Sequence, residues 1–101
     1  MTGSKPGLNA AHGKGMTAYS IAKSAVFHLA ALMNEESRGS NVITTVIVPG
    51  TIDTLQNRKS MPDADFEKWV TPQSIADIIC WYSGEQSQVI REPILKLYNR
   101  S

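Results

Sequence analysis

Residues 41–50 read NVITTVIVPG, and this stretch decides the predicted fold. Every position from 42 to 48 is Val, Ile or Thr, and Pro49 with Gly50 closes the run. Branched side chains favour strands, and an apolar run that does not alternate with polar residues is typical of a strand covered on both faces. The stretch therefore predicts a central parallel strand over residues 42–48.

A long helix is predicted immediately before this strand, over residues 16–37. Apolar residues recur there at helical spacing, and Arg38 with Gly39 provides a stop signal. The stripe consists of Tyr19, Ala22, Val26, Leu29 and Met33. Because the other faces are also largely apolar, we expect this helix to be covered on two sides, by a sheet and by a partner.

A second helix and strand follow. Thr71 and Pro72 are typical of an N-cap and a first helical residue, which predicts a helix over residues 72–83. The apolar residues at 94–98 predict a final strand. Alternating helices and strands indicate an α/β fold with a parallel sheet. Two helices and two strands cannot cover one another, so we expect residues 1–101 to be a single partial domain.

Two segments lack a clear period. Residues 1–15 are rich in Gly and small side chains and predict a loop. Residues 51–70 predict a long polar connection with a short helical turn near residues 63–69, and loops of this length are usually functional. Trp69 is a candidate for contact with a substrate, whereas Trp81 is expected to pack against its apolar neighbours.

Composition excludes several classes of function. The chain of 101 residues carries ten basic and nine acidic side chains, interspersed, which argues against nucleic-acid binding. Its apolar stretches are too short to cross a bilayer and no signal peptide is apparent, so we expect a soluble, cytoplasmic protein. Cys80, the single cysteine, is interpreted as a buried structural thiol. His12 and His28 lack partners at ligand spacing, so no metal site is predicted.

The motif YSIAK, residues 19–23, places a phenol and an amine on one side of the predicted helix. Side chains four residues apart on a helix are neighbours, and a cation near a phenol favours the phenolate. Tyr19 and Lys23 are therefore candidates for a general acid/base pair. The spacing alone also occurs by chance, so its context matters.

YSIAK at the start of this helix, followed by VITTVIVPG and TIDT, resembles the short-chain dehydrogenase/reductase family. The stretch PGTIDT with NRKSMPDADFEKWVTP looks similar to the quinonoid dihydropteridine reductase branch. The resemblance covers nearly the whole chain. It implies the C-terminal half of a Rossmann-like doubly wound parallel sheet, and a homo-oligomer in which helix 16–37 packs against its twin.

The resemblance also implies roles for particular residues. Tyr19 would exchange a proton with a small-molecule substrate during hydride transfer to a carbonyl or quinonoid imine. Lys23 would favour the phenolate and hold the ribose of NAD or NADP. Residues 51–70 would form a substrate lid. The nicotinamide end of the cofactor would meet Pro49, Gly50, Ile52 and Thr54.

Two points leave alternatives open. The family's catalytic serine matches Ser4 only if the loop carries a two-residue insertion, and the dihydropteridine reductase branch lacks that serine. The glycine-rich turn that receives the pyrophosphate has no counterpart in the sequence. The alternative function is therefore a non-catalytic remnant that acts as an interaction or dimerisation module.

Overall fold

The computed structural model describes all 101 residues and has an α/β fold. Its two strands form one parallel pair. The elements are, in chain order, α1 (Lys5–Leu8), α2 (Thr17–Glu36), β1 (Val46–Pro49), α3 (Leu55–Ser60), α4 (Pro72–Tyr82) and β2 (Ile94–Leu97). Short 3₁₀ helices lie at Ala10–His12, Phe66–Lys68 and Glu85–Ser87.

The chain divides into two compact units. The first unit comprises Met1–Val48 and Glu92–Lys96, and the second comprises Pro49–Arg91 and Leu97–Ser101. The division falls within both strands, so each unit contains part of β1 and part of β2.

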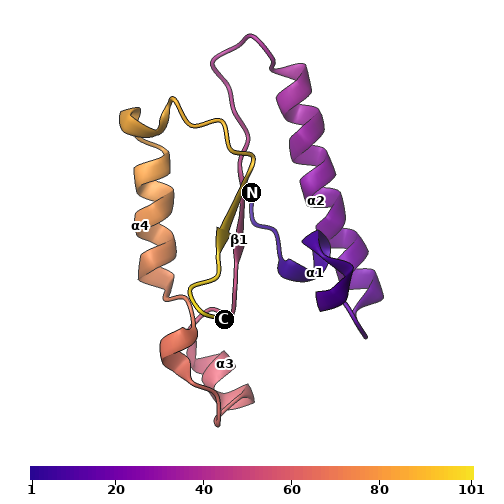
Figure 1. Cartoon of the computed structure of the whole chain (residues 1–101), viewed down its shortest axis with the longest axis vertical. Helices are drawn as coiled ribbons and strands as arrows, with labels where there is room; N and C mark the ends of the chain where they lie inside the picture. Colours follow the sequence, from indigo (N-terminus) through magenta and orange to yellow (C-terminus); the bar gives the residue numbers. More distant parts are fainter. The chain divides into compact units, whose positions relative to one another are not determined.

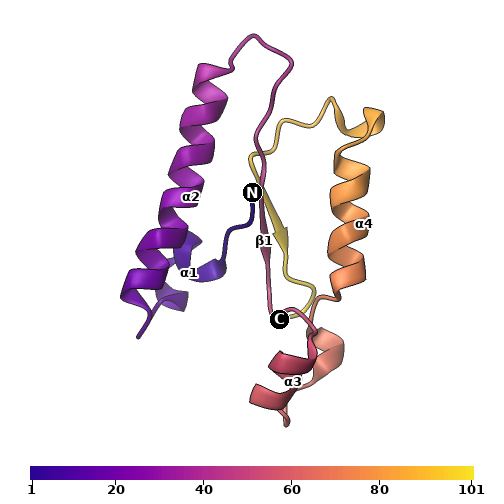
Figure 2. The ribbon, with the colours of Figure 1, turned by 180° about the vertical axis from the view of Figure 1, so that it is seen from behind.

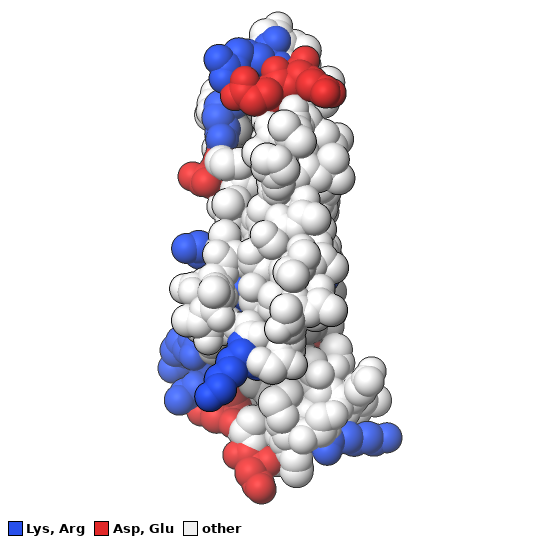
Figure 3. All heavy atoms as spheres, turned by 90° about the vertical axis from the view of Figure 1, so that its right-hand side faces the viewer, with Lys and Arg blue, Asp and Glu red and all other residues white.

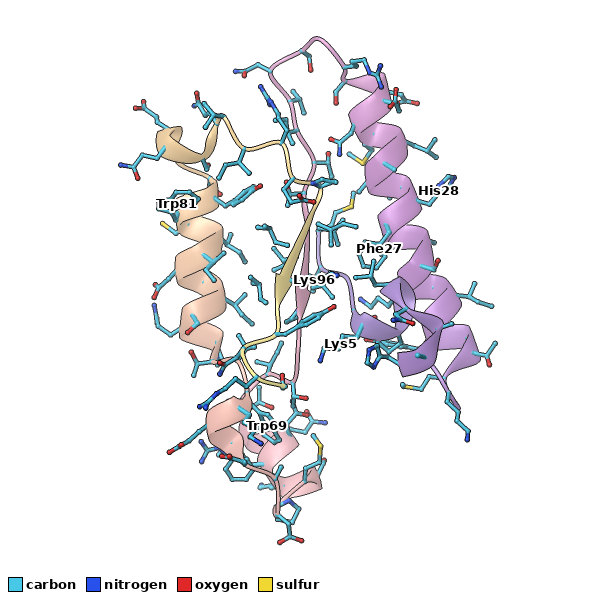
Figure 4. The ribbon with its side chains drawn as sticks, in the orientation of Figure 1. Lys5, Phe27, His28, Trp69, Trp81 and Lys96 are labelled. Atoms are coloured by element: carbon cyan, nitrogen blue, oxygen red, sulfur yellow. The ribbon has the colours of Figure 1, made fainter.

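In the first unit, α1 lies against the early turns of α2 (Figures 1 and 2). Phe27 points from α2 toward the strand side, whereas His28 points away from it (Figure 4). Ala30, Val46 and Val48 are almost fully buried and form the core. The predicted helix 16–37 is confirmed to within one residue at each end.

Residues 1–3 pair with β1 in a parallel arrangement. The Ile47 N–H donates to the Met1 carbonyl at 2.9 Å, and the Gly3 N–H donates to the Ile47 carbonyl at 2.8 Å. The Val46 N–H donates to the Pro93 carbonyl just before β2. Hydrogen bonds on both of its edges make β1 a central strand, as its apolar run predicts.

The predicted bounds of this strand are wrong at its start, because β1 begins at Val46 rather than at residue 42. The Asn34 side chain donates to the Thr44 carbonyl at 2.9 Å and accepts from the Thr44 N–H at 2.8 Å. These two bonds use the backbone groups that a ladder would need. Val42 and Ile43 are exposed, so their branched side chains do not enter the core.

The prediction of a plain loop at residues 1–15 is also wrong in part, since α1 and one 3₁₀ helix lie there. Glycine at positions 3 and 7 allows the segment to lie directly on α2. A Cβ on Gly7 would be 2.6 Å from the Lys23 carbonyl carbon, and one on Gly3 would be 2.6 Å from the Phe27 ring. The same glycines that indicate a loop by composition are required here for close packing.

In the second unit, the ends of the segment 51–70 meet. Ile52 and Val70 form a parallel bridge, the Val70 N–H donates to the Thr51 carbonyl, and the Asp53 N–H donates to the Val70 carbonyl. Between these ends lie α3, which the sequence did not predict, and the 3₁₀ helix at 66–68, which agrees with the predicted helical turn.

Helix α4 begins as predicted, with the Thr71 side chain accepting from the Ser74 N–H at 3.1 Å. The predicted bounds 72–83 and 94–98 are confirmed to within one residue. The prediction that Cys80 is buried is wrong, because its side chain is exposed on α4. Trp81 is also half exposed and donates from its indole to Gln86 at 3.2 Å, so it is not a core residue of this chain.

Candidate active site

Tyr19 and Lys23 lie one turn apart near the start of α2, on neighbouring positions of its surface. The Lys23 ammonium is 5.9 Å from the centroid of the Tyr19 ring. Tyr19 is 48% exposed, so part of the residue is open to a ligand. The two groups are close enough to face a common ligand, although no hydrogen bond joins them.

Helix α1 supports the Lys23 side of this pair. Gly7 packs against the Lys23 backbone and Cβ so closely that no side chain fits between them. Lys23 is half-buried, and its ammonium lies on the same side of α2 as the Tyr19 ring. The packing of α1 on α2 thus fixes the part of the helix that carries Lys23.

Ser4 caps the N-terminal end of α1 by position, but its side chain makes no capping bond. Its hydroxyl oxygen is buried and has no hydrogen-bond partner. Buried polar groups without partners are uncommon in folded proteins and carry a free-energy cost. The structure therefore places Ser4, Tyr19 and Lys23 in the same unit and leaves the Ser4 hydroxyl unsatisfied.

The predicted cofactor residues after β1 lie in the second unit. The Gly50 N–H donates to the Leu97 carbonyl at 2.9 Å, and the Thr51 N–H donates to the Ser101 hydroxyl at 3.3 Å. A Cβ on Gly50 would collide with Ser101 and Tyr98. Gly50 is therefore needed for the close approach of residues 98–101, and its N–H is already used within the chain.

Ile52 and Thr54 each have a hydrogen-bond donor that is not used within the chain. The Ile52 carbonyl accepts from the Asn57 side chain at 2.7 Å, but the Ile52 N–H makes no hydrogen bond within the chain. The Thr54 hydroxyl accepts from the Asn57 N–H at 3.1 Å, which leaves its own hydrogen free to donate. A free N–H and a free O–H suit the acceptor oxygens of a carboxamide and a phosphate.

The segment 51–70 is held together by side chains that the sequence analysis did not single out. The Arg58 guanidinium donates to both carboxylate oxygens of Asp53, at 2.6 and 2.8 Å. The same guanidinium lies 4.5 Å from the centre of the Phe66 ring, which is 4.8 Å from the Trp69 ring. The hydrogen bond from Arg58 holds the pKa of Asp53 below its ordinary value.

Trp69 belongs to the interior of this segment. It is 7% exposed, and Figure 4 shows it among the side chains of the region that contains α3. The Asn99 side chain donates to its carbonyl at 2.8 Å. The interpretation of Trp69 as a substrate contact is therefore not supported, because its ring is covered by the segment itself.

Other classes of site are not indicated by the geometry. No three His, Cys, Asp or Glu side chains are grouped closely enough to hold a metal ion. None of the helices is both long enough and apolar enough to span a membrane.

The structure thus combines an α/β fold with a Tyr–Lys pair at the start of a long helix. The chain is similar to a dihydropteridine reductase of Dictyostelium discoideum, with 31% identity over 104 aligned positions. The similarity covers all of this chain but only 44% of that relative, so the chain spans less than half of its length. No family model matches the chain.

Proposed function

We propose that this chain is the catalytic and substrate-side half of a nicotinamide-dependent reductase of the short-chain dehydrogenase/reductase type. The observation that carries the proposal is the exposed Tyr19 with Lys23 beside it, on a helix supported by α1. The similarity to a dihydropteridine reductase over the whole chain supports it. In such an enzyme, the parallel strands would belong to a larger doubly wound sheet.

The proposed reaction is reduction of a carbonyl or a quinonoid imine. Bound NADH or NADPH would supply the hydride to the electrophilic carbon of the substrate. Tyr19 would donate its hydroxyl proton to the oxygen or nitrogen that gains negative charge, and solvent would restore that proton. Lys23 would stabilise the phenolate that remains after proton transfer. The name of the relative favours a dihydropteridine as the substrate.

The residues after β1 fit the nicotinamide end of such a cofactor. The Ile52 N–H and the Thr54 hydroxyl are donors without an acceptor in this turn. Pro49 and Gly50 would contribute by shaping the turn, since the Gly50 N–H is bound to Leu97. The Ser4 hydroxyl would gain the substrate oxygen or nitrogen as the partner that it lacks. Neither NAD nor NADP is favoured by these contacts.

The segment 51–70 would cover the substrate as a preformed lid. Its ends are joined by the Ile52–Val70 bridge, and its interior is filled by Phe66 and Trp69. Leu55 on α3 and Met61 just after it are exposed and would provide apolar contacts for a flat ring system.

A homo-oligomer through α2 is part of the proposal. An uncharged face runs along this helix, and Figure 3 shows Lys, Arg, Asp and Glu gathered toward its ends. The exposed residues on this face share a spacing of three or four positions. They are Ala18, Ile21, Ala22, Ala25, His28, Leu29 and Leu32. Small side chains at its centre would allow a second copy of α2 to approach closely.

The alternative function is a non-catalytic interaction module, and one observation favours it. Large apolar side chains are exposed on α4 as well as on α2, including Ile78, Ile79 and Trp81. Surfaces of this kind commonly mark sites of protein association. In this alternative, Tyr19 and Lys23 would be inherited residues without a catalytic role.

Titration of the chain with NADH and NADPH, followed by nicotinamide fluorescence, distinguishes the two functions. Saturable binding together with reduction of a quinonoid dihydropteridine is the expected result for the reductase. A chain that binds neither nucleotide, but associates with a longer relative of the same fold, would support the interaction module instead. Binding of NADH and NADPH with equal affinity would also support the reductase.

A further inference from the structure

Asn57 holds the turn that follows β1 at two points. Its side-chain amide donates to the Ile52 carbonyl at 2.7 Å, and its backbone N–H donates to the Thr54 hydroxyl oxygen at 3.1 Å. Both bonds are partly buried, so water competes with them less than it would at the surface. One residue of α3 thereby contacts two residues of the proposed cofactor site.

The orientation of Ile52 follows from its neighbours. In the bridge to Val70, the ladder bonds are made by Thr51 and Asp53, so the N–H and the carbonyl of Ile52 point to the opposite edge. These two groups of an extended residue lie on the same side of the chain. The bond from Asn57 to the carbonyl therefore also sets the direction of the free Ile52 N–H.

Asn57 also determines whether the Thr54 hydroxyl can donate a hydrogen bond to a ligand. A hydroxyl that accepts a hydrogen bond from a backbone N–H is left with its own hydrogen to donate. Without the bond from Asn57, the Thr54 hydroxyl could rotate between donating and accepting. Asn57 therefore leaves both residues of the turn as donors, which matches a ligand that presents acceptor oxygens.

We propose that Asn57 is a positioning residue that aims the Ile52 N–H and the Thr54 O–H at the nicotinamide mononucleotide portion of the cofactor. This assignment rests on the proposed reductase function and extends it to a residue of α3. Asn57 itself would not touch the reacting atoms. It would act by fixing two donors before the ligand arrives, which reduces the ordering cost of binding.

The test uses the whole chain, reduced nicotinamide mononucleotide as the probe, and ribose 5-phosphate as a probe that lacks the carboxamide. Asn57→Asp preserves size and the backbone N–H but replaces the amide donor with a carboxylate that repels the Ile52 carbonyl. Gln56→Glu is the matched control, because it makes the same amide-to-carboxylate change on the exposed neighbouring position of α3. Binding is followed through the NMR signal of the Ile52 amide.

The expected result is that the mononucleotide shifts the Ile52 amide signal in the parent chain. Asn57→Asp should weaken its binding about tenfold, as expected for one lost hydrogen bond next to an unfavourable charge, whereas Gln56→Glu should not. Ribose 5-phosphate should be affected much less by Asn57→Asp. Equal loss for both probes, or no loss for either, overturns the assignment. A parent chain that binds neither probe contradicts the proposed function itself, and the parent titration reveals this separately.

Discussion

The Lys23 ammonium lies 5.9 Å from the centre of the Tyr19 ring, on the next turn of α2. The backbone of Lys23 is also in close contact with Gly7 of α1. The pair is therefore part of a packed structure and not only a sequence motif on a free helix surface.

Replacing Tyr19 with Phe should remove the proton donor and little else. We expect turnover in any active assembly to fall by about two to four orders of magnitude, as is typical when a general acid is lost. Nucleotide affinity should change little, because the ring and Lys23 remain. Steady-state kinetics and a fluorescence titration measure the two quantities, with Tyr82→Phe on α4 as the control. Unchanged turnover would remove Tyr19 from the mechanism.

Replacing Ser4 with Ala tests whether its unpartnered hydroxyl serves a ligand. Removing a buried polar group that has no partner should leave the free energy of unfolding unchanged or raise it slightly. If the hydroxyl binds substrate, turnover should nevertheless fall by about tenfold. Denaturant unfolding and kinetics separate these effects. A stable variant with full turnover would assign Ser4 no role in the reaction.

Replacing Gly7 with Ala should disturb the contact between α1 and α2. The new Cβ would lie 2.6 Å from the Lys23 carbonyl carbon, so the backbones must separate. We expect the free energy of unfolding to decrease by about 1–3 kcal/mol, the usual cost of overpacking. Ala10→Val, at an exposed position nearby, is the control. Equal stability of the Gly7 variant and the parent would show that α1 does not pack on α2 in solution.

The ion pair between Asp53 and Arg58 should make the segment 51–70 sensitive to acid. The pKa of Asp53 is lowered, mainly by the hydrogen bond from Arg58, so the folded state favours the carboxylate. The contribution is present above the ordinary carboxyl pKa of about 4 and is lost as pH falls through the lower folded value. NMR of the Phe66 and Trp69 rings across this range should show the segment 51–70 loosening. Asp53→Asn should show the loosened signals already at neutral pH.

Placing a charge at the centre of the uncharged face of α2 should prevent self-association. Ala25→Arg would bring two guanidinium groups together across an interface between two copies, without disturbing the buried side of the helix. We expect sedimentation analysis to show a dimer for the parent chain and a monomer for this variant. Ala76→Arg, the same change on an exposed position of α4, is the control. A parent chain that sediments as a monomer would contradict the proposed oligomer.

Most of the fold could be predicted from local patterns. Helix 16–37 and helix 72–83 were recognised because apolar spacing and capping residues are encoded within each segment. The central position of β1 followed from an apolar run that does not alternate. The start of this strand could not be predicted in the same way, because the Asn34 side chain, ten residues away, occupies the backbone of Thr44.

Some features of the candidate site could likewise be predicted from local sequence, and others could not. Tyr19 and Lys23 could be proposed from their spacing, since four residues on a helix suffice to make neighbours. No sequence pattern singles out Asn57, apart from its position three residues after the capping Thr54. Likewise, Ile52 and Val70 close the segment 51–70 through backbone hydrogen bonds, which residue types do not predict.

Local sequence was thus sufficient for helices, for the branched strand and for a phenol–amine pair one helical turn apart, because each depends on interactions within a few residues. Tertiary structure decided that Gly7 packs against Lys23, that the Ser4 hydroxyl is buried without a partner, and that Asn57 bonds to both Ile52 and Thr54. It also buried Trp69 and exposed Cys80, against expectation. These outcomes depend on which backbone passes beside which side chain, and residue patterns along one segment do not encode that proximity.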